Sequence, residues 1–513
     1  MSLARTHSVA LVGVEGHLVE IEADIAQGLP ATILVGLPDT ALREARDRIR
    51  AAIVNTGESW PQTKITVGLS PASLPKRGSG FDLAIAIAIL AAADALPLSS
   101  PAGKMFLAEL GLDGRLRPVP GVLPAVVAAE ASVNAVDTVV VAAENAAEAS
   151  LVPGVRVVAA GSLAEVAMWL RGGPVPAPPG PAAQQREPAA GPSKPRKDLA
   201  EVLGQSEARI ATEICAAGGH NLSLLGPPGA GKTMLAERLP TILPRLEPAA
   251  ALEVTSIHSV AGALPTGAGL LTEPPFCAPH HTASKAAIVG GGSGVIRPGA
   301  ASLAHRGVLF LDEAPEFQRD VLDALRQPLE AGEVIIARSA MCARFPARFT
   351  LVLAANPCPC AKASSGGAGC ECSPATRRRY LARLSGPLLD RVDVKVRLQP
   401  VNRQEMLYDR KFTETSAVVA ERVAAARERS AHRLRGTPWR LNAEIPGAEL
   451  RRSYTPERGA LRSLDRAMEL GQVTARGADK IVRVAWSVAD LAGKARPGAR
   501  DVEFAIGLWL GVT

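Results

Sequence analysis

Residues 226–233, GPPGAGKT, place three glycines, a lysine and a threonine in the spacing G-x-x-x-x-G-K-T. Glycine backbone N–H groups can wrap around phosphate oxygens at a helix N-terminus, where the helix dipole favours anions. In this motif the lysine reaches the β- and γ-phosphates, and the threonine hydroxyl binds Mg²⁺. The sequence therefore predicts a nucleoside triphosphate site, formed by Gly226, Pro227, Pro228, Gly229, Ala230, Gly231, Lys232 and Thr233.

Two carboxylates and an amide follow apolar runs further along the chain. The run GVLFL ends in Asp312 and Glu313, and the run 350–355 ends in Asn356. We expect Asp312 to hold the Mg²⁺ through water, Glu313 to act as general base, and Asn356 to orient the attacking water. The alternatives are an ordinary strand leading into a loop, and an asparagine that opens a turn before Pro357. Together with the phosphate motif, the residues indicate a nucleoside triphosphatase.

Four cysteines stand close together directly after Asn356. Cys358, Cys360, Cys370 and Cys372 form the pattern C-x-C-x9-C-x-C around a Gly/Ser-rich spacer. Four thiolates can close a tetrahedral Zn²⁺ site. An odd total of seven cysteines in a long chain argues against a disulfide framework, and a set of inert thiols remains the alternative. We predict a structural Zn²⁺ that staples this loop.

Apolar periodicity and turn residues divide the chain into three parts with a linker. Residues 1–170 alternate short strands with helices, as expected of a mixed α/β domain. Residues 171–197 are rich in Pro, Ala and Gly and read as a linker. Residues 198–399 form a second α/β region, which is expected to open with a helix over 198–217 and a strand over 221–225. Residues 400–513 have helical spacing almost throughout.

The overall composition is that of a protein with several apolar cores. The chain has 513 residues, of which 47% are hydrophobic and 3% aromatic, and a formal net charge of +7. This charge permits an anionic partner but is too mild to establish one. The N-terminus lacks the apolar segment of a secretory signal, and the longest uncharged apolar run, residues 83–93, is too short to span a membrane. We expect a cytoplasmic protein without a membrane partner.

Ordered stretches of this chain resemble the AAA+ ATPases of the magnesium-chelatase-like group, specifically the YifB/ComM competence-protein family. They include "LPKRGSGFDLAIAIAIL", "AGGHNLSLLGPPGAGKT", "FCAPHHTASKAAIVGGG", "GVLFLDEAPEF", "AANPCPC" and "LSGPLLDRVD". The resemblance implies a P-loop AAA+ core with a C-terminal helical lid, preceded by a Lon-protease-like (S5-type) α/β domain. It also implies a homo-hexameric ring in which ATP hydrolysis drives DNA helicase and branch-migration activity during recombination in natural transformation.

The same resemblance assigns roles to several arginines. Arg391, in "PLLDRVD", matches the arginine finger that enters the neighbouring subunit's site. The alternative is a surface arginine paired with Asp390 or Asp393. Arg476 looks like the sensor-2 arginine of the lid, with Arg483 as a weaker candidate. The hairpin over 334–349 would point into the ring's pore. There Arg338 and Arg344 would contact DNA phosphates, unless the hairpin is simply a basic surface feature.

Two rival functions and a pair of adjacent histidines also have to be considered. One rival is the motor subunit of a magnesium chelatase. The other is a Lon-type protease, which would need a serine nucleophile and a lysine base. The sequence disfavours it because Gly80 stands at the nucleophile position and Ser79 is one place early. The segment that corresponds to the lysine segment of such proteases, RPVPGVLPAVVAAEA, has no lysine. The adjacent His280 and His281 invite a metal interpretation, but we find no convincing carboxylate or thiolate partner nearby and favour a structural or pore-loop role.

Overall fold

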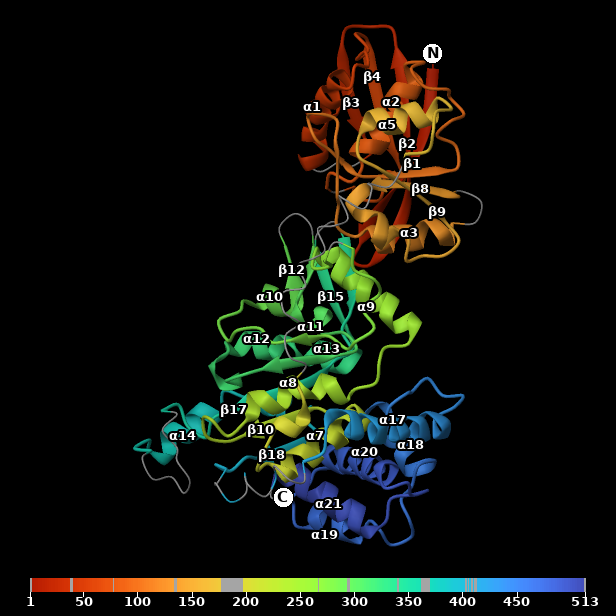
Figure 1. Ribbon diagram of the computed structural model, residues 1–513. Coiled ribbons are helices and arrows are strands. Elements are labelled where there is room, and N and C mark those ends of the chain that lie inside the picture. The colour runs from red at the N-terminus through yellow and green to blue at the C-terminus, as the bar shows by residue number, and fades with distance from the viewer. Residues whose placement is uncertain are drawn as a thin grey trace.

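The computed structural model describes residues 2–511 except 37–39, 77, 133–135, 177–196, 266, 293–295, 339–340, 361–369, 402–403, 405, 407–408 and 410–412. Most of the predicted linker therefore lies outside the described residues. An N-terminal α/β domain, a central α/β core and a C-terminal helical domain follow one another along the long axis of the molecule (Figure 1). In the described part of the chain, no helix is long and apolar enough to cross a membrane.

The N-terminal domain is a seven-stranded mixed sheet with helices on both faces. The strand order is β3-β4-β2-β1-β5-β8-β9, and β1 and β2 form a long antiparallel pair. One apolar core, under α1, α2 and α5, covers one face of the sheet, and a second, under α3 and α4, covers the other. The elements are β1 (Ser2–Val12), β2 (Glu15–Ala26), β3 (Ala31–Val35), α1 (Thr40–Asn55), β4 (Lys64–Ser70), α2 (Asp82–Ala92), β5 (Lys104–Leu107), β6 (Glu109–Leu110), β7 (Leu116–Arg117), α3 (Val122–Ala131), β8 (Thr138–Ala142), α4 (Ala146–Ala149), β9 (Arg156–Ala160) and α5 (Leu163–Leu170).

The central core is built on a five-stranded sheet in the order β11-β14-β17-β10-β18, in which all neighbours are parallel. Alternate residues of β14 enter different cores, Val308 and Phe310 on one face and Leu309 and Leu311 on the other. A parallel sheet buried on both faces explains why these strands are continuous apolar runs. The bounds are α7 (Ser206–Gly218), β10 (Leu222–Leu225), α8 (Lys232–Ile242), α9 (Pro248–Ala261), β11 (Phe276–Cys277), α10 (Lys285–Val289), β12 (Gly290–Gly291), β13 (Arg297–Pro298), α11 (Ala300–Leu303), β14 (Val308–Leu311), α12 (Arg319–Ala324), α13 (Arg326–Ala331), β15 (Glu333–Arg338), β16 (Met341–Pro346), β17 (Thr350–Ala355), α14 (Pro374–Leu381), α15 (Gly386–Leu389) and β18 (Val394–Arg397).

The prediction of one continuous helix over 198–217 is wrong. A short 3-10 helix covers Leu199–Glu201, and α7 begins only at Ser206. Gly204, between them, has φ +71°, a left-handed conformation that interrupts a helix. The backbone also passes close to Val401 there, since a Cβ at Gly204 would lie 2.1 Å from the Val401 side chain.

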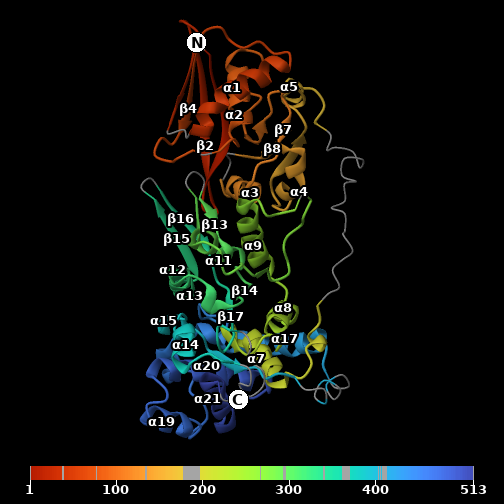
Figure 2. The same cartoon turned by 90° about the vertical axis from the view of Figure 1, so that its left-hand side faces the viewer.

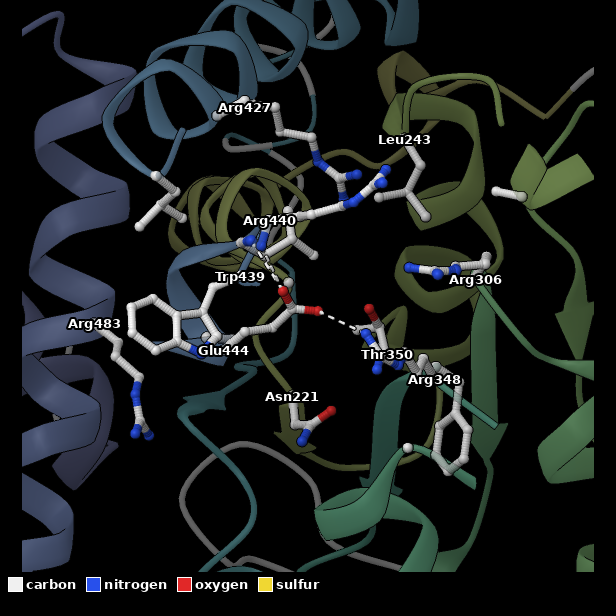
Figure 3. A pocket seen from close by; sticks show the side chains of 18 of the residues that line it. Asn221, Leu243, Arg306, Arg348, Thr350, Arg427, Trp439, Arg440, Glu444 and Arg483 are labelled. Atoms are coloured by element: carbon white, nitrogen blue, oxygen red, sulfur yellow. Dashed lines mark hydrogen bonds and ion pairs between the residues drawn. The ribbon is translucent and has the colours of Figure 1, made fainter. Parts of the chain in front are cut away.

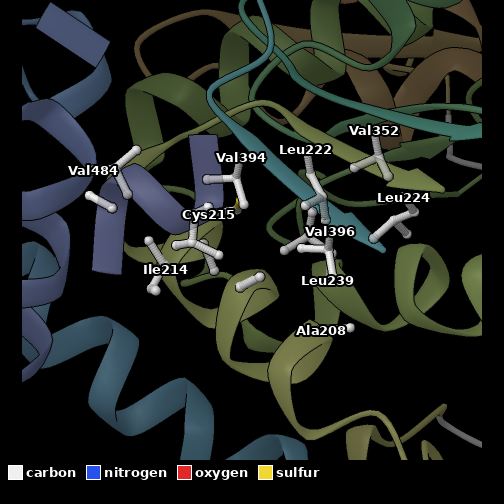
Figure 4. Close-up of a cluster of buried hydrophobic side chains, with 14 of the residues drawn as sticks. Ala208, Ile214, Cys215, Leu222, Leu224, Leu239, Val352, Val394, Val396 and Val484 are labelled. Carbon is white, nitrogen blue, oxygen red and sulfur yellow. The ribbon is translucent and has the colours of Figure 1, made fainter. Parts of the chain in front are cut away.

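The helical domain shares an apolar cluster with the central core. Figure 4 shows Ile214 and Cys215 of α7 beside Val484 of α20 and Val394 of β18, all members of that cluster. Burial of this shared surface fixes the domain against α7, α8 and β18. Its helices are α17 (Ser416–Arg433), α18 (Gly447–Arg452), α19 (Arg462–Glu469), α20 (Ala475–Leu491) and α21 (Ala499–Leu510).

The N-terminal domain rests on α9 and on the β15–β16 hairpin. The Gly121 amide, at the start of α3, donates to the Ser259 carbonyl of α9 at 3.1 Å, and Figure 2 shows α3 directly above α9. The turn between β1 and β2 lies on β16, where a Cβ at Gly13 would meet the Arg344 carbonyl oxygen at 2.4 Å. Leu11 and Val14 pack there against the buried Phe345.

Candidate active site

The predicted phosphate-binding and hydrolytic residues meet at the carboxyl edge of the central sheet. β10 leads into Gly226, β14 into Asp312 and β17 into Asn356. Because these strands are parallel neighbours, their ends lie side by side, as ligand sites of open α/β sheets do. The topology therefore brings together segments that are 43 to 130 residues apart in the sequence: 356 − 313 = 43 and 356 − 226 = 130.

The loop 226–231 has the backbone conformation that phosphate binding requires. Gly229 and Gly231 have φ +77° and +91°, and Gly231 is the residue from which α8 starts. A Cβ at Gly226 would lie 2.9 Å from the Leu398 carbonyl oxygen, so that position too needs glycine. The loop delivers backbone N–H groups to the start of an 11-residue helix, which is a favourable place for an anion.

Lys232 points back into this loop. Its Nζ donates to the Gly226 carbonyl at 2.7 Å, the Pro227 carbonyl at 2.9 Å and the Asn356 Oδ1 at 3.0 Å. Burial lowers the pKa of Lys232, while the charges of Asp312 and Glu313 oppose that shift. The ammonium group and the Asn356 amide thus meet where the terminal phosphate of a bound nucleotide would lie.

The carboxylates of β14 face the threonine of α8. Thr233 Oγ1 donates to Asp312 Oδ2 at 2.8 Å, so the two predicted Mg²⁺ ligands are already in contact. Hydroxyl and carboxylate oxygens are the hard donors that Mg²⁺ prefers. Glu313 follows with φ +49°, an uncommon conformation for a non-glycine residue, and its amide donates to Asp312 Oδ1 at 2.9 Å.

One residue of this site was missed by the sequence analysis. His281 Nδ1 lies 3.5 Å from Glu313 Oε2, so the conclusion that the histidine pair has no carboxylate partner is wrong. The partner is invisible in the sequence because β11, which precedes the histidines, pairs with β14, which precedes Glu313. The His280 and His281 rings lie with centroids 4.1 Å apart and planes tilted by 34°, and His280 Nδ1 contacts the Thr282 hydroxyl at 2.8 Å instead. We assign no metal to this histidine pair.

The four cysteines form a compact cluster beside the hydrolytic residues. Their Sγ atoms all lie within 4.8 Å of one another, although the spacer 361–369 lies outside the described residues. A tetrahedral Zn²⁺ with bonds of about 2.3 Å separates its sulfurs by about 3.8 Å, so the donor set fits zinc. Burial raises the pKa of the Cys358 thiol, whereas a backbone hydrogen bond from Cys372 lowers that of Cys370. A cation would stabilise all four thiolates together.

The helix that follows the cysteines returns to the active site. Tyr380 of α14 is buried, and burial together with the charges of Glu316 and Glu313 raises its pKa to about 12. The thiol cluster therefore connects Asn356, at one end of the segment, to a helix that packs near Glu313.

Arg391 and Arg476 lie at the other edge of the same sheet. Asn221 precedes β10, and its side-chain amide donates to the Arg391 carbonyl at 2.9 Å, whereas the phosphate loop follows β10. A four-residue strand spans about 13 Å. Arg391 forms an ion pair with Glu330, not with Asp390 or Asp393, and Arg476 Nη2 lies 3.3 Å from the same Glu330 oxygen. The structure does not bring Arg391 and Arg476 to their own chain's phosphate loop.

Both arginines line a large cleft between the central core and the helical domain. Its volume is about 1340 Å³, and ten basic and six acidic side chains line it, including Arg391, Arg476 and Glu330. Figure 3 shows Arg306, Arg348, Arg427 and Arg440 directed into the same cleft. The cleft is thus suited to an anionic group.

Arg483 is held within the helical domain. Its Nε donates to the Ile445 carbonyl at 2.7 Å, and burial lowers its pKa. Nearby, Lys480 Nζ and Asp393 Oδ1 form a buried pair at 2.7 Å, which ties α20 to the segment that carries Arg391.

Arg338 and Arg344 occupy the predicted hairpin, β15 paired with β16. Both side chains are exposed, and Arg344 Nη1 lies 3.8 Å from Glu333. On β16 the buried Ala343 and Phe345 alternate with Arg344, so the arginine lies on the face away from the N-terminal domain. The tip, residues 339–340, lies outside the described residues.

The protease motif has a different set of contacts. The Ser79 hydroxyl donates to the Glu109 carboxylate, and the ammonium group of the buried Lys76 donates to the Pro71 carbonyl. The nearest lysine in the sequence is therefore engaged elsewhere, in keeping with the absence of a serine–lysine dyad.

Three family models match consecutive parts of the chain. "Subunit ChlI of Mg-chelatase" matches residues 21–145, "Magnesium chelatase, subunit ChlI" matches 198–406, and "Magnesium chelatase, subunit ChlI C-terminal" matches 413–508. The second of these models covers the predicted nucleotide-site residues from Gly226 to Arg391, and the third covers Arg476. The described fold is accordingly that of an α/β protein with a ChlI-like N-terminal domain, a magnesium-chelatase AAA-type domain and a C-terminal helical domain.

Individual relatives align over nearly the full length. The chain is 51% identical to the uncharacterized protein Rv2897c of Mycobacterium tuberculosis over 506 residues, covering 99% of this chain and 98% of the relative. It is 42% identical to the competence protein ComM of Haemophilus influenzae (96% and 95% covered) and 42% identical to the uncharacterized protein YifB of Salmonella typhimurium (96% and 94% covered).

Proposed function

We propose, from the premise that this chain belongs to the YifB/ComM family of magnesium-chelatase-like ATPases, that it is an ATP-driven DNA motor which works as a homo-hexameric ring. The work performed would be helicase and branch-migration activity in recombination, in the setting of natural transformation. The matching ATPase domain implies ATP and Mg²⁺. The ring, the DNA and the motor activity are the proposal.

The observation that carries the ring is the division of the catalytic groups between two edges of one sheet. The phosphate loop, Asp312, Glu313 and Asn356 lie at the carboxyl edge, and Arg391 and Arg476 lie at the amino edge. An ATPase of this kind needs a guanidinium at the transferred phosphoryl group. In a ring, the amino edge of one protomer would supply it to the carboxyl edge of the next.

Each described side chain then has a defined task. Lys232 and the loop amides bind the β- and γ-phosphates, while Thr233 and Asp312 hold the Mg²⁺, which neutralises phosphate charge. Glu313 accepts a proton from the attacking water, and Asn356 orients that water. A neighbour's Arg391 and Arg476 stabilise the charge that develops on the γ-phosphoryl oxygens.

The DNA part of the proposal is supported by the basic hairpin. Both guanidinium groups are exposed: Arg344 lies on the face away from the N-terminal domain, and Arg338 lies next to the hairpin tip on the face that carries Phe345. Exposed guanidinium groups on a supported hairpin suit contacts with a phosphate backbone. The net charge of +7 is compatible with this partner.

The N-terminal domain and the cysteines would support the motor without catalysing the reaction. We propose a Lon-protease-like (S5-type) fold without proteolytic activity for residues 1–170, because Ser79 is engaged with Glu109. We also propose a structural Zn²⁺ held by Cys358, Cys360, Cys370 and Cys372, whose sulfurs are close enough to share one ion. The ion would fix the position of Asn356 relative to α14.

The motor subunit of a magnesium chelatase is the second candidate function, because all three matching family models describe that subunit. The experiment that separates the two measures ATPase rate and binding with forked DNA at increasing salt. We expect stimulation of the ATPase, and DNA affinity that falls with salt, because phosphate contacts release counterions. Replacing Arg338 and Arg344 together with alanine should abolish the stimulation and leave the DNA-free rate intact. No stimulation and no salt-sensitive binding would favour the chelatase subunit.

A further inference from the structure

We propose that the Glu330 carboxylate occupies, within the single chain, the place that the neighbour's γ-phosphate takes in the assembled ring. Glu330 would then be a built-in competitor, which holds Arg391 and Arg476 together until a nucleotide-loaded neighbour displaces it. This inference rests on the ring proposed above and adds a regulatory contact to it.

The first observation is that one carboxylate oxygen serves both arginines. Glu330 Oε1 forms ion pairs with Nη2 of Arg391 and, at 3.3 Å, with Nη2 of Arg476. The three residues come from α13, from the loop before β18 and from α20, so their meeting is a tertiary feature. A phosphoryl oxygen between two guanidinium groups would make the same pair of contacts.

The second observation is the electrostatic need for an anion at this point. The Arg391 side chain is only 10% exposed, and its Nε is buried without a hydrogen-bond partner among the described residues. Burial and the nearby charges of Arg476 and Arg326 all lower the Arg391 pKa. A buried guanidinium beside other cations is stable only with a counter-charge. Glu330 supplies that charge inside the chain, and a phosphate would supply it in the ring.

The third observation is that the Glu330 side chain is exposed enough to move away from the two arginines. Its side chain is 52% exposed, whereas Arg391 is nearly buried, so the carboxylate lies at the mouth of the cleft. It stands near the end of the short helix α13, and Gly332 follows with φ +71°. A carboxylate displaced from the arginines can therefore be hydrated at once. Displacement would cost the ion pairs, so an incoming nucleotide has to compete with them.

The experiment measures ATP-dependent assembly of the full chain in a Glu313→Gln background, where hydrolysis is blocked. Sedimentation velocity at increasing ATP gives the ATP concentration at half-assembly. Glu330→Gln removes the competing charge with little change in size, and Glu330→Ala removes the hydrogen-bond acceptor as well. Glu247→Gln is the matched control, because Glu247 lines the same cleft and pairs with a different arginine, Arg440, at 3.1 Å.

We expect both Glu330 variants to assemble at about three- to tenfold lower ATP than the parent, and the Glu247 variant to assemble like the parent. The competition is refuted if the Glu330 variants assemble at the same or higher ATP, since Glu330 would then be irrelevant or merely a support for the arginines. Thermal unfolding of each variant confirms that it is folded. Adding Arg391→Ala to the parent separates the competition by Glu330 from the proposed ring. A parent that never assembles refutes the ring itself, whereas a parent that assembles only with Arg391 keeps the ring whatever Glu330 does.

Discussion

The two edges of the central sheet differ in how complete they are. At the carboxyl edge, the phosphate loop, Asp312, Glu313 and Asn356 contact one another within one chain. At the amino edge, Arg391 and Arg476 meet only a carboxylate, Glu330, at the mouth of a wide basic cleft. The first edge has, within one chain, the groups that nucleotide binding and hydrolysis need. The second has the charges that such a reaction needs but no phosphate loop of its own. In the proposed ring, one protomer would hold two halves of two different sites.

The largest effect is expected from removing the arginine of the amino edge. Arg391→Ala should lower the turnover number about 10³-fold, the lower end of what an arginine finger contributes. A matched change in the same cleft, Arg435→Ala, should have little effect, because that exposed side chain does not contact Glu330.

Mixing Arg391→Ala with Glu313→Gln subunits tests the trans arrangement directly. Each variant retains the edge that the other lacks, so mixed rings contain some complete sites. We expect the mixture to recover a measurable fraction of ATPase activity that neither variant has. A mixture as inactive as its components, in rings that demonstrably exchange subunits, would place Arg391 in its own chain's site or outside catalysis.

The Glu313→Gln change on its own has the next largest expected effect. Loss of the general base should lower turnover about 10²-fold or more, while ATP remains bound because Lys232 and the loop amides are intact. Equilibrium binding of a fluorescent nucleotide and steady-state ATPase measure the two properties. If turnover is normal, another group accepts the proton. If binding is lost, Glu313 has a structural role.

The difference between the edges also decides what the sequence could predict. The functional residues of the carboxyl edge belong to short contiguous sequence motifs, each of which directly follows a strand. Those strands, β10, β14 and β17, lie side by side in the sheet and bring the motifs together. The strand predicted over 221–225 is confirmed as β10, Leu222–Leu225, because a short apolar run followed by a glycine-rich turn is a local signal. The helix over 198–217 was mispredicted because a left-handed glycine, Gly204, interrupts an otherwise helical pattern.

The amino edge and the histidine contact depend on pairings between distant segments. Glu330 is one of many exposed glutamates, and only its position on α13, beside the loop before β18, brings it to Arg391. His281 reaches Glu313 because β11 and β14 are neighbours, an order that the two-residue strand β11 does not reveal. Neither contact leaves a local pattern in the sequence.

Removal of the thiol cluster tests the support of the carboxyl edge. Replacing Cys358 with serine should eliminate about one equivalent of bound zinc per chain. It should also lower the unfolding temperature by about 2–10 °C, as expected from a loss of about 1–3 kcal/mol. Cys342→Ser is the matched control, because that exposed thiol lies on β16 outside the cluster. Mass spectrometry of the metal content and calorimetry give both values. Zinc content unchanged in the Cys358 variant would exclude the cluster as the binding site.

The smallest effect concerns His281, which extends the carboxyl edge by one residue. Its imidazole lies beside the Glu313 carboxylate, and Glu313 itself is held at an unfavourable φ of +49°, so the histidine can keep the carboxylate in one orientation. His281→Ala should therefore lower kcat about two- to fivefold, the effect of losing a partly exposed ionic contact of up to about 1 kcal/mol, with KM nearly unchanged. His281→Gln, which retains a donor, should recover part of the loss. A His281→Ala enzyme with altered KM and unchanged kcat would show that the histidine acts on nucleotide binding and leaves the general base alone.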